Sequence, residues 1–583
     1  MDNQRLLTWA LFGMMAWLSY QAWMLDYGPQ PTETPAATQE PLIEAPDDPL
    51  PQLTSTDIDA PAVQPSLDAA PAVDDVALSP VIHVQTDVFD IELSTQGGTV
   101  QRAVLRNYPV AKDRPDELVE LLSTNPNEIG LIQSGLRSAA DGPEPNHRAV
   151  FTAKQQSYVV SGSGDLVVPL SWSDGAGVTV EKRYRFTADG YAIALEQEIS
   201  NNSAETWRGA EYVQLLRRNF ERKRSMFDVD SYSVDAPIVY DGEKSEKLQR
   251  DDLLEDGPYA YSSERGWFGA IQHHFVSAVV PAPGSSQRYS VSVRDVVSTA
   301  SSIGPTQVVE PGTSKTFTTT LFVGPKLQGQ LEEIDESLKL TVDYGWLTIL
   351  SQPLFWLLSK AFGLFGNWGV SIIAVTILIK AAFYKLTESS GRSMAKMRNL
   401  QPRLKALQER YKDDKPQLSQ AMMELYKREK VNPAAGCLPI LIQMPFFLAF
   451  YWVLLESVEM RQAPFALWLT DLSTKDPFFV LPLIMGGAMF FQQKLNPQVG
   501  DPVQVKVMQF MPIIFTGFFA FFPSGLVLYW VTNTLLSIAQ QWKINKVVEK
   551  EAKQAKQGKG GKRSKKGDKG DKGDKGDKGD KGG

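Results

Sequence analysis

A single lysine, Lys380, interrupts one of the most apolar stretches of this 583-residue chain. The stretch 368–384 reads WGVSIIAVTILIKAAFY, and Lys380 is its one charged residue. A charge inside a membrane-length apolar segment is costly, so it indicates function by default, here a cation that attracts acidic groups. The competing interpretation is snorkelling, because Lys385 lies roughly 7 Å further along the helix and the Lys380 stem could reach the interface. The lysine by itself favours neither interpretation.

Polar residues in the apolar stretches favour the functional interpretation. Thr376 lies four residues before Lys380 and shares its helix face, and Ser371 is roughly aligned. The other stretches contribute Gln443, Gln492, Gln493, Gln509, Thr516, Thr532, Asn533, Ser537, Gln540 and Gln541. Each of these could serve only as a helix–helix hydrogen bond, which is the more frequent role. Together with one cation that has no acid in its own stretch, they predict a hydrated groove open to the cytoplasm, lined by Thr376, Gln443, Gln509, Thr516 and Asn533.

The usual motifs of soluble enzymes are missing from the sequence. There is one cysteine, Cys437, and none of the four histidines lies in an HExxH motif. Phosphate-binding, dinucleotide-binding and GxSxG motifs are not found either. We therefore expect no catalytic residue, no metal and no cofactor. His273 and His274 are neighbours, but on a strand they would point to opposite faces, so a joint site is not expected.

Six apolar stretches have the composition of membrane spans. A bilayer core of about 30 Å needs roughly 20 helical residues, and the first stretch, 6–25, has this length without any charge. The others are 368–384, 437–458, 478–493, 505–523 and 525–544. Several are short, which local thinning of the bilayer can accommodate. A seventh stretch, 346–364, contains Gln352, Pro353 and Lys360, and it predicts an amphipathic helix lying in the interface.

The distribution of charge predicts the orientation of these spans. Residues 385–430 carry 12 basic and 6 acidic residues, and residues 546–583 carry 14 basic and 7 acidic residues. By the positive-inside rule both segments are cytoplasmic, as is the N-terminus with Arg5. Six spans satisfy all three assignments, so the region between the first two spans must lie outside. The mildly acidic net charge of −8 argues against DNA as a partner.

The predicted outer region has two parts. Residues 26–80 contain 11 prolines, 11 acidic residues and no Lys or Arg, which predicts a disordered linker. Residues 81–335 contain alternating segments such as VTVEKRYRF and YAIALEQEI, separated by Gly, Asn, Asp and Pro. This pattern predicts an antiparallel β-sandwich. Residues 328–340 resemble a helix leading toward the membrane, so 336–365 would connect to the interfacial helix.

The basic segment 386–430 is predicted to form a helical hairpin. Apolar residues recur three or four residues apart on either side of a turn at Pro416, and Met394, Met397 and Met422 belong to this stripe. Pro402 is expected to kink the first arm. The simpler interpretation is that the stripe packs one arm against the other. The alternative is that some methionines stay exposed to hold apolar segments of other proteins.

The last segment, 546–583, ends in five Gly-Asp-Lys repeats between residues 567 and 581. Glycine at every third position opposes a stable helix, so we expect a flexible tail. The basic residues of this tail either serve only to fix the orientation of the protein in the membrane, or they bind ribosomal RNA or anionic lipid.

Four segments of the chain resemble the YidC family of bacterial membrane protein insertases. They are MAKMRNLQPRLKALQERY, YKREKVNPAAGCLPILIQMPFFLAFYWVL, RQAPFALWLTDLSTKDPFFVLP and FMPIIFTGFFAFFPSGLVLYW. The resemblance covers residues 346–545, and the first span, linker and β region are similar to the Gram-negative form. It implies an inner-membrane protein with a periplasmic β-supersandwich, a five-helix core at 366–545 around a hydrophilic groove, and a cytoplasmic hairpin that receives clients.

The resemblance also implies roles for individual residues. The groove cation of the family matches Lys380, although the family usually has arginine there. Client contacts would fall at Met444, Pro445, Phe510, Phe515 and Phe519. The Gly-Asp-Lys tail departs from the family pattern.

The leading hypothesis is therefore an insertase and chaperone for inner-membrane proteins, acting alone or with the Sec translocon. Its partners would be nascent membrane proteins and the lipid bilayer, with the ribosome and the signal recognition particle receptor at the hairpin and tail. The alternatives are a small-solute transporter, although no inverted repeat is visible, and a tethered periplasmic carbohydrate-binding protein.

Overall fold

The computed structural model describes residues 80–140, 142–162, 164–218, 235–411, 414–429, 431, 438–495 and 502–567. The predicted span 6–25, the linker up to residue 79, Cys437 and the tail after residue 567 lie outside the described residues. The described chain forms two compact units. One is built of strands and extends to Asp343, with Glu456–Glu459 added; the other is helical and comprises Tyr344–Leu455 and the chain from Met460 onward.

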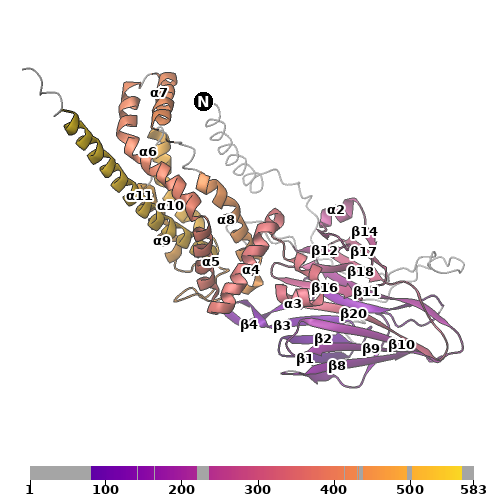
Figure 1. Ribbon diagram of the computed structural model, residues 1–583. Coiled ribbons are helices and arrows are strands. Elements are labelled where there is room, and N and C mark those ends of the chain that lie inside the picture. Colours follow the sequence, from indigo (N-terminus) through magenta and orange to yellow (C-terminus); the bar gives the residue numbers. More distant parts are fainter. Residues whose placement is uncertain are drawn as a thin grey trace, which may run out of the picture. The chain divides into compact units, whose positions relative to one another are not determined.

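The β unit consists of two large sheets (Figure 1). One has 11 strands in the order β14-β17-β18-β11-β5-β3-β2-β1-β7, with β19 beside β11 and β4 beside β3. The other has nine strands in the order β13-β12-β15-β16-β20-β10-β9-β8-β6. The strands are β1 (Val81–Gln85), β2 (Phe89–Ser94), β3 (Val100–Ala111), β4 (Arg114–Leu122), β5 (Gly130–Ser138), β6 (Thr152–Ala153), β7 (Ser157–Val159), β8 (Asp165–Ser173), β9 (Val178–Thr187), β10 (Ala192–Asn201), β11 (Trp207–Arg218), β12 (Ala236–Tyr240), β13 (Ser245–Lys247), β14 (Tyr259–Ser263), β15 (Trp267–Ile271), β16 (Phe275–Pro281), β17 (Gln287–Arg294), β18 (Val297–Ile303), β19 (Gln307–Val309) and β20 (Thr313–Pro325).

Alternation of apolar and polar residues explains these sheets. Along β10, buried and half-buried residues alternate at every position, as expected for a strand with one face on a core. Strand β10 pairs antiparallel with β9 and β20. One described pair, β1 with β7, is parallel, which departs from a purely antiparallel sandwich. The prediction of a β-sandwich is otherwise confirmed.

Polar side chains cross from one sheet to the other inside this core. Lys182 on β9 is fully buried, and its Nζ donates to the carbonyl oxygens of Gly97 (2.6 Å) and Ser134 (2.9 Å). Gln197 on β10 donates to Glu211 on β11 over 2.9 Å. Burial lowers the pKa of Lys182 to about 7 and raises the pKa of Glu211 to about 7. The interior of the sandwich therefore contains ionisable groups, Lys182 and Glu211 among them, that the sequence pattern did not indicate.

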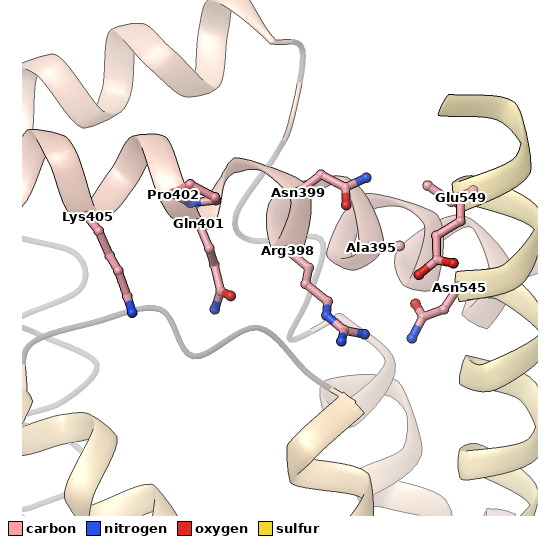
Figure 2. Close-up of a pocket in the computed structure, with 9 residues that line it drawn as sticks. Ala395, Arg398, Asn399, Gln401, Pro402, Lys405, Asn545 and Glu549 are labelled. Atoms are coloured by element: carbon pink, nitrogen blue, oxygen red, sulfur yellow. The ribbon is translucent and has the colours of Figure 1, made fainter. Parts of the chain in front are cut away.

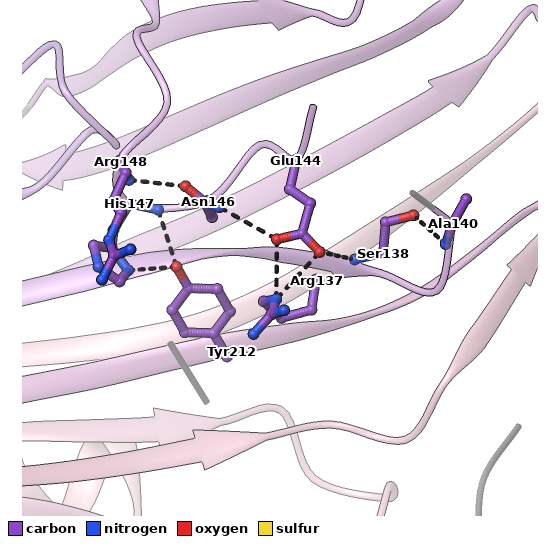
Figure 3. A network of polar contacts seen from close by, with 8 residues as sticks. All are labelled: Arg137, Ser138, Ala140, Glu144, Asn146, His147, Arg148 and Tyr212. Carbon is purple, nitrogen blue, oxygen red and sulfur yellow. Dashed lines mark hydrogen bonds and ion pairs between the residues drawn. The ribbon is translucent and has the colours of Figure 1, made fainter. Parts of the chain in front are cut away.

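The segment between β5 and β6 is fixed by polar contacts to the neighbouring strands (Figure 3). The Glu144 carboxylate accepts from Arg137 Nε (3.0 Å) and from the backbone N–H of Ser138 (2.9 Å). Tyr212 Oη accepts from the backbone N–H of His147 and lies 2.6 Å from its Nδ1. These contacts bury His147 beside β11, so this histidine has a structural role.

His273 and His274 do not follow the expected geometry. They lie in the turn between β15 and β16 and not on a strand, so the alternation rule does not apply. Their rings stack 3.9 Å apart with an interplanar angle of 17°. Lys326 holds the turn, because its Nζ donates to the His273 carbonyl and its backbone N–H to the His274 carbonyl. The expectation that the two rings point apart was wrong.

The β unit also contains short helices. These are α2 (Arg250–Glu255), α3 (Gln328–Ile334) and a 3-10 helix, Glu336–Thr341. The helix predicted at 328–340 is thus two helices separated at Asp335. The Asp335 backbone is extended, and its side chain accepts from the Ser337 backbone N–H, which caps the second helix.

The helical unit contains eight α-helices among the described residues. They are α4 (Thr348–Phe365), α5 (Trp368–Ala382), α6 (Tyr384–Arg410), α7 (Lys415–Arg428), α8 (Leu438–Glu456), α9 (Val480–Leu495), α10 (Pro502–Phe519) and α11 (Ser524–Gly567). A 3-10 turn, Gly345–Leu347, precedes α4, and another, Val458–Met460, follows α8. Local capping sets some of these ends: Gly366 ends α4 in the left-handed conformation, and Asn367 caps α5.

Length and hydropathy do not single out a spanning helix in the described part of the chain. None of its helices taken alone is both long and apolar enough to cross a membrane. One pair, α5 with α6, meets these criteria jointly and is bent by 68° at the break between them.

Candidate functional site

Lys380 lies in the last turn of α5, just before the bend into α6. Its Nζ donates to Ser537 Oγ on α11 over 2.8 Å. Ser537 in turn donates its hydroxyl proton to the Asn533 carbonyl oxygen, 2.7 Å away. Within the described residues, Lys380 has no acidic partner within ion-pair distance. The contact joins residues 157 positions apart and fixes the lysine against α11.

This geometry leaves N–H donors of the Lys380 ammonium group available for a further hydrogen-bond partner. A lysine has three N–H donors, and Ser537 takes one of them. Because Ser537 donates to a backbone carbonyl, its oxygen is oriented to accept, and it holds the charge without neutralising it. Lys380 is half-buried. A partly buried, unneutralised cation can attract a carboxylate or a polar peptide segment more strongly than a fully solvated one.

Of the other polar residues predicted to line the groove, the two threonines use their hydroxyls within their own helices, whereas the two glutamines are at least partly exposed. Thr376 is buried and donates to the Ile372 carbonyl within its own helix. Thr516 donates to the Pro512 carbonyl and lies against α9 at Gly486, so its hydroxyl is used locally. Gln443 is half-buried and Gln509 exposed. The structure thus brings Lys380 together with Ser537 and the Asn533 carbonyl, and it places Thr516 at a different helix contact.

Aromatic rings from three helices form a second feature of the unit. Phe447 of α8 and Phe519 of α10 lie 4.6 Å and 5.2 Å from the ring of Trp530 on α11. Phe515 stacks 6.0 Å from Phe519. Phe519 is 2 % exposed, so it packs inside the bundle. A client could contact Phe519 only if these helices moved apart.

The exposed apolar residues lie elsewhere on the same helices. Phe510 is 60 % exposed and Met444 is 43 % exposed. Exposed apolar side chains follow Phe510 along α10, namely Ile513, Ile514 and Phe518. Pro445 is half-buried within α8. Of the five residues assigned to client contact, Met444 and Phe510 are the two with the most accessible side chains.

Helices α6 and α7 form the hairpin that the stripe of apolar residues predicts. Met397, Leu400 and Leu404 of α6 pack with Tyr426 of α7 in a buried cluster, and Met394 and Met422 pack against it. Met397 is 4 % exposed. Met423, which lies outside the predicted stripe, is 53 % exposed. The stripe therefore mainly joins the two arms, and the exposed methionine is one that the spacing did not identify.

A pocket of about 600 Å³ lies between α6 and α11. Figure 2 shows Arg398, Gln401 and Lys405 projecting from α6, with Asn545 and Glu549 on α11. Its lining combines two cations, one carboxylate and several amides, which suits a polar peptide segment. The residues of this pocket were not identified from the sequence, because only the docking of α6 on α11 brings them together.

Two family models together cover most of the chain. The model for the YidC periplasmic domain matches residues 81–357, and the model for the 60Kd inner membrane protein matches residues 360–552. The membrane protein insertase YidC of Methylococcus capsulatus is 46% identical over 555 residues, covering 94% of this chain and 99% of the relative. That of Pseudomonas aeruginosa PAO1 is 42% identical over 582 residues, covering 95% and 100%.

This chain belongs to the YidC family. The family predicted from the sequence is thereby confirmed. Among solved structures, an active YidC insertase with its first transmembrane domain resolved is similar at 18% identity and a TM-score of 0.38, covering 80% of this chain and 94% of that one.

Membership of the YidC family also bears on the competing hypotheses. The relatives reported above are named as insertases, and neither the transporter nor the tethered carbohydrate-binding protein finds support in these comparisons. The signal for Lys380 was visible in the sequence, because a lysine in an apolar run is unusual. Ser537 was one of ten polar candidates, and nothing in its spacing marked it as the partner of Lys380.

Proposed function

We propose that this chain inserts and folds inner-membrane proteins by receiving their polar segments in a groove beside Lys380. The observation that carries the proposal is the contact between Lys380 and Ser537, which holds a cation between α5 and α11 without an acidic partner among the described residues. An acidic or polar client segment would be drawn to this charge from the cytoplasm. The apolar part of the client would leave along the exposed residues of α8 and α10, Met444 and Phe510 first.

The proposed topology has six spans, with both termini in the cytoplasm and the β unit in the periplasm. It rests on the basic segments 385–430 and 546–583 and on the acidic segment 26–80, which has no Lys or Arg. In this arrangement α6, α7 and the end of α11 lie in the cytoplasm. The pocket at Arg398 and Lys405 would then be a first contact for a client before it reaches Lys380.

The further partners remain part of the proposal. The Sec translocon would act with this chain on larger clients. The ribosome and the signal recognition particle receptor would bind the hairpin and the basic tail, where the charge is suited to RNA phosphates and acidic surfaces. Deletion of residues 546–583 should lower co-sedimentation with ribosomes at low salt, and an unchanged profile across a salt series would reject the ribosome contact.

Reconstitution tests the proposed function directly. The purified chain is placed in liposomes without another protein or ATP, and a small single-span client is synthesised in their presence. We expect the outer segment of the client to become protected from protease well above the level in empty liposomes. No protection, in vesicles where the β unit and hairpin resist protease as folded units, would reject autonomous insertion.

A further inference from the structure

An apolar groove runs along the surface of α9 and α11, away from the site at Lys380. Its volume is about 690 Å³. Helix α9 contributes Ile484, Gly487 and Phe491, and α11 contributes Leu535 and Trp542. Phe491 is 65 % exposed, Trp542 55 % and Leu535 49 %. These side chains border the groove without other described parts of the protein covering them.

The shape of the groove suits a single hydrocarbon chain. A Cβ added at Gly487 would meet no atom within 4 Å, so the floor of the groove is open at this residue. The groove follows α9 from Ile484 to Leu495, roughly 16 Å at the rise of a helix. This length is close to half of the ~30 Å hydrocarbon core, which is the depth of one leaflet.

One end of the groove is cationic. Lys494 belongs to the lining, and Lys546 lies one turn of α11 beyond Trp542 with its Nζ 3.6 Å from the centre of the indole ring. Both lysines are exposed. Among the described residues no acid lines the groove, and Glu549 of α11 belongs to the pocket on the α6 side. A tryptophan beside lysines at the end of an apolar surface is typical of the membrane interface.

We propose that this groove binds one anionic phospholipid, with an acyl chain along Gly487 and its phosphate between Lys494 and Lys546. The apolar walls account for the chain, and the two lysines account for the negative headgroup. In the topology proposed above, the lipid belongs to the cytoplasmic leaflet. The site would seal the outer surface of α9 and α11 against the bilayer, separately from the client path at α8 and α10.

Lipid titration of the purified full-length chain tests the proposal. Phosphatidylglycerol and phosphatidylcholine with identical acyl chains are added to the delipidated protein, and bound lipids are counted by native mass spectrometry. We expect one phosphatidylglycerol to bind more tightly than phosphatidylcholine. Replacing Lys494 or Lys546 by Gln should weaken phosphatidylglycerol binding about fivefold for each lysine and leave phosphatidylcholine unchanged. Lys506→Gln, which removes an exposed lysine outside the groove, is the matched control.

A second variant distinguishes the contribution of the shape of the groove to lipid binding from that of its lysines. Gly487→Leu should fill the floor of the groove and weaken binding of both lipids there, whereas Gly363→Leu, at an exposed glycine of α4 with equally open space, should not. Equal binding of the two lipids to the wild type, or undiminished binding to a folded Gly487→Leu variant, would overturn the proposal. A photo-crosslinker at Leu535 that captures mainly polypeptide in cells would also overturn it. Failure of insertion in liposomes would not change these lipid counts, so the two proposals fail separately.

Discussion

The ammonium group of Lys380 donates to the hydroxyl of Ser537, which itself donates to the Asn533 carbonyl, and this partner determines what the lysine can do. A carboxylate at the position of Ser537 would neutralise the charge, whereas a serine keeps it available. Lysine offers a point charge and not the planar fork of an arginine. Attraction of an acidic segment requires only the charge.

Removal of this charge should therefore affect clients unequally. We expect Lys380→Gln to slow insertion of clients with acidic outer segments several-fold more than insertion of neutral ones. Lys380→Arg should retain most of the activity, since it keeps the charge. Protease protection in liposomes measures both, with Lys360→Gln on α4 as the control for loss of a lysine. Equal slowing of acidic and neutral clients would contradict the electrostatic role.

The buried acid of the β unit gives a second prediction at the residue scale. Burial raises the pKa of Glu211 to about 7 from an ordinary value of 4.5. The folded state therefore binds a proton more tightly, and this contribution to stability is complete below pH 4.5 and lost as the pH rises to about 7. The Glu211→Gln variant should therefore lack a decrease in the free energy of unfolding, on the order of 3 kcal/mol, that the wild type shows as the pH rises.

Urea unfolding of the full chain at pH 5 and pH 7, followed through its β-sheet circular dichroism, checks this expectation. Lys182 interacts electrostatically with Glu211, but its own lowered pKa of about 7 affects stability mainly between pH 7 and 10.5, above the range compared. Glu205→Gln, at an exposed position, should keep the wild-type change in unfolding free energy between pH 5 and pH 7. If Glu211→Gln also kept this change, another group would have to titrate in this range.

Helix α9 packs closely on α10 at Gly486. A Cβ added at Gly486 would lie 2.0 Å from Thr516 Oγ1, whereas the adjacent Gly487 has open space. Gly486→Ala should therefore destabilise the helical unit by about 1–3 kcal/mol through overpacking. Gly487→Ala should be neutral or stabilise it by up to about 1 kcal/mol, because alanine favours helix. Thermal unfolding in detergent compares the two variants. Equal changes in their unfolding temperatures would mean that α9 and α10 move apart to accommodate the added methyl group.

The hairpin has two kinds of methionine, and they should respond differently. Met397→Ala removes a buried side chain from the cluster that joins α6 and α7, so we expect a loss of about 2–5 kcal/mol in local stability. Met423→Ala, at an exposed position, should change stability by less than about 0.5 kcal/mol. Hydrogen exchange of the hairpin amides measures both. Reduced insertion by Met423→Ala with unchanged exchange would support a role of this methionine in holding clients.

The proposed orientation of the protein in the membrane rests on the distribution of charge. Cysteine labelling tests it once the single natural cysteine has been removed. In a Cys437→Ser background, Ser286→Cys in the β unit should react with a membrane-impermeant maleimide added outside spheroplasts. Gln420→Cys in the hairpin should react only after permeabilisation. Both positions are exposed, so their access to the reagent depends on the side of the membrane. Labelling of Gln420→Cys from outside would overturn the topology.

Local periodicity explains why much of this protein could be predicted from its sequence. Alternation along segments such as β9 and β10 predicted the sandwich, and the three- and four-residue spacing predicted both arms of the hairpin. The same reasoning failed at His273 and His274, since a two-residue turn interrupts the strand. It also missed the break at Asp335, where a side-chain cap competes with helix continuation.

The sequence by itself determined that a cation lies in an apolar stretch, which segments are basic, and to which family the chain is similar. Only the tertiary structure decided that Ser537 is the partner of Lys380, that Thr516 faces α9, and that Lys182 and Glu211 are buried in the sandwich. The physical reason is that composition and spacing act within one element. Partners, burial and pockets depend on how elements distant in the chain pack together.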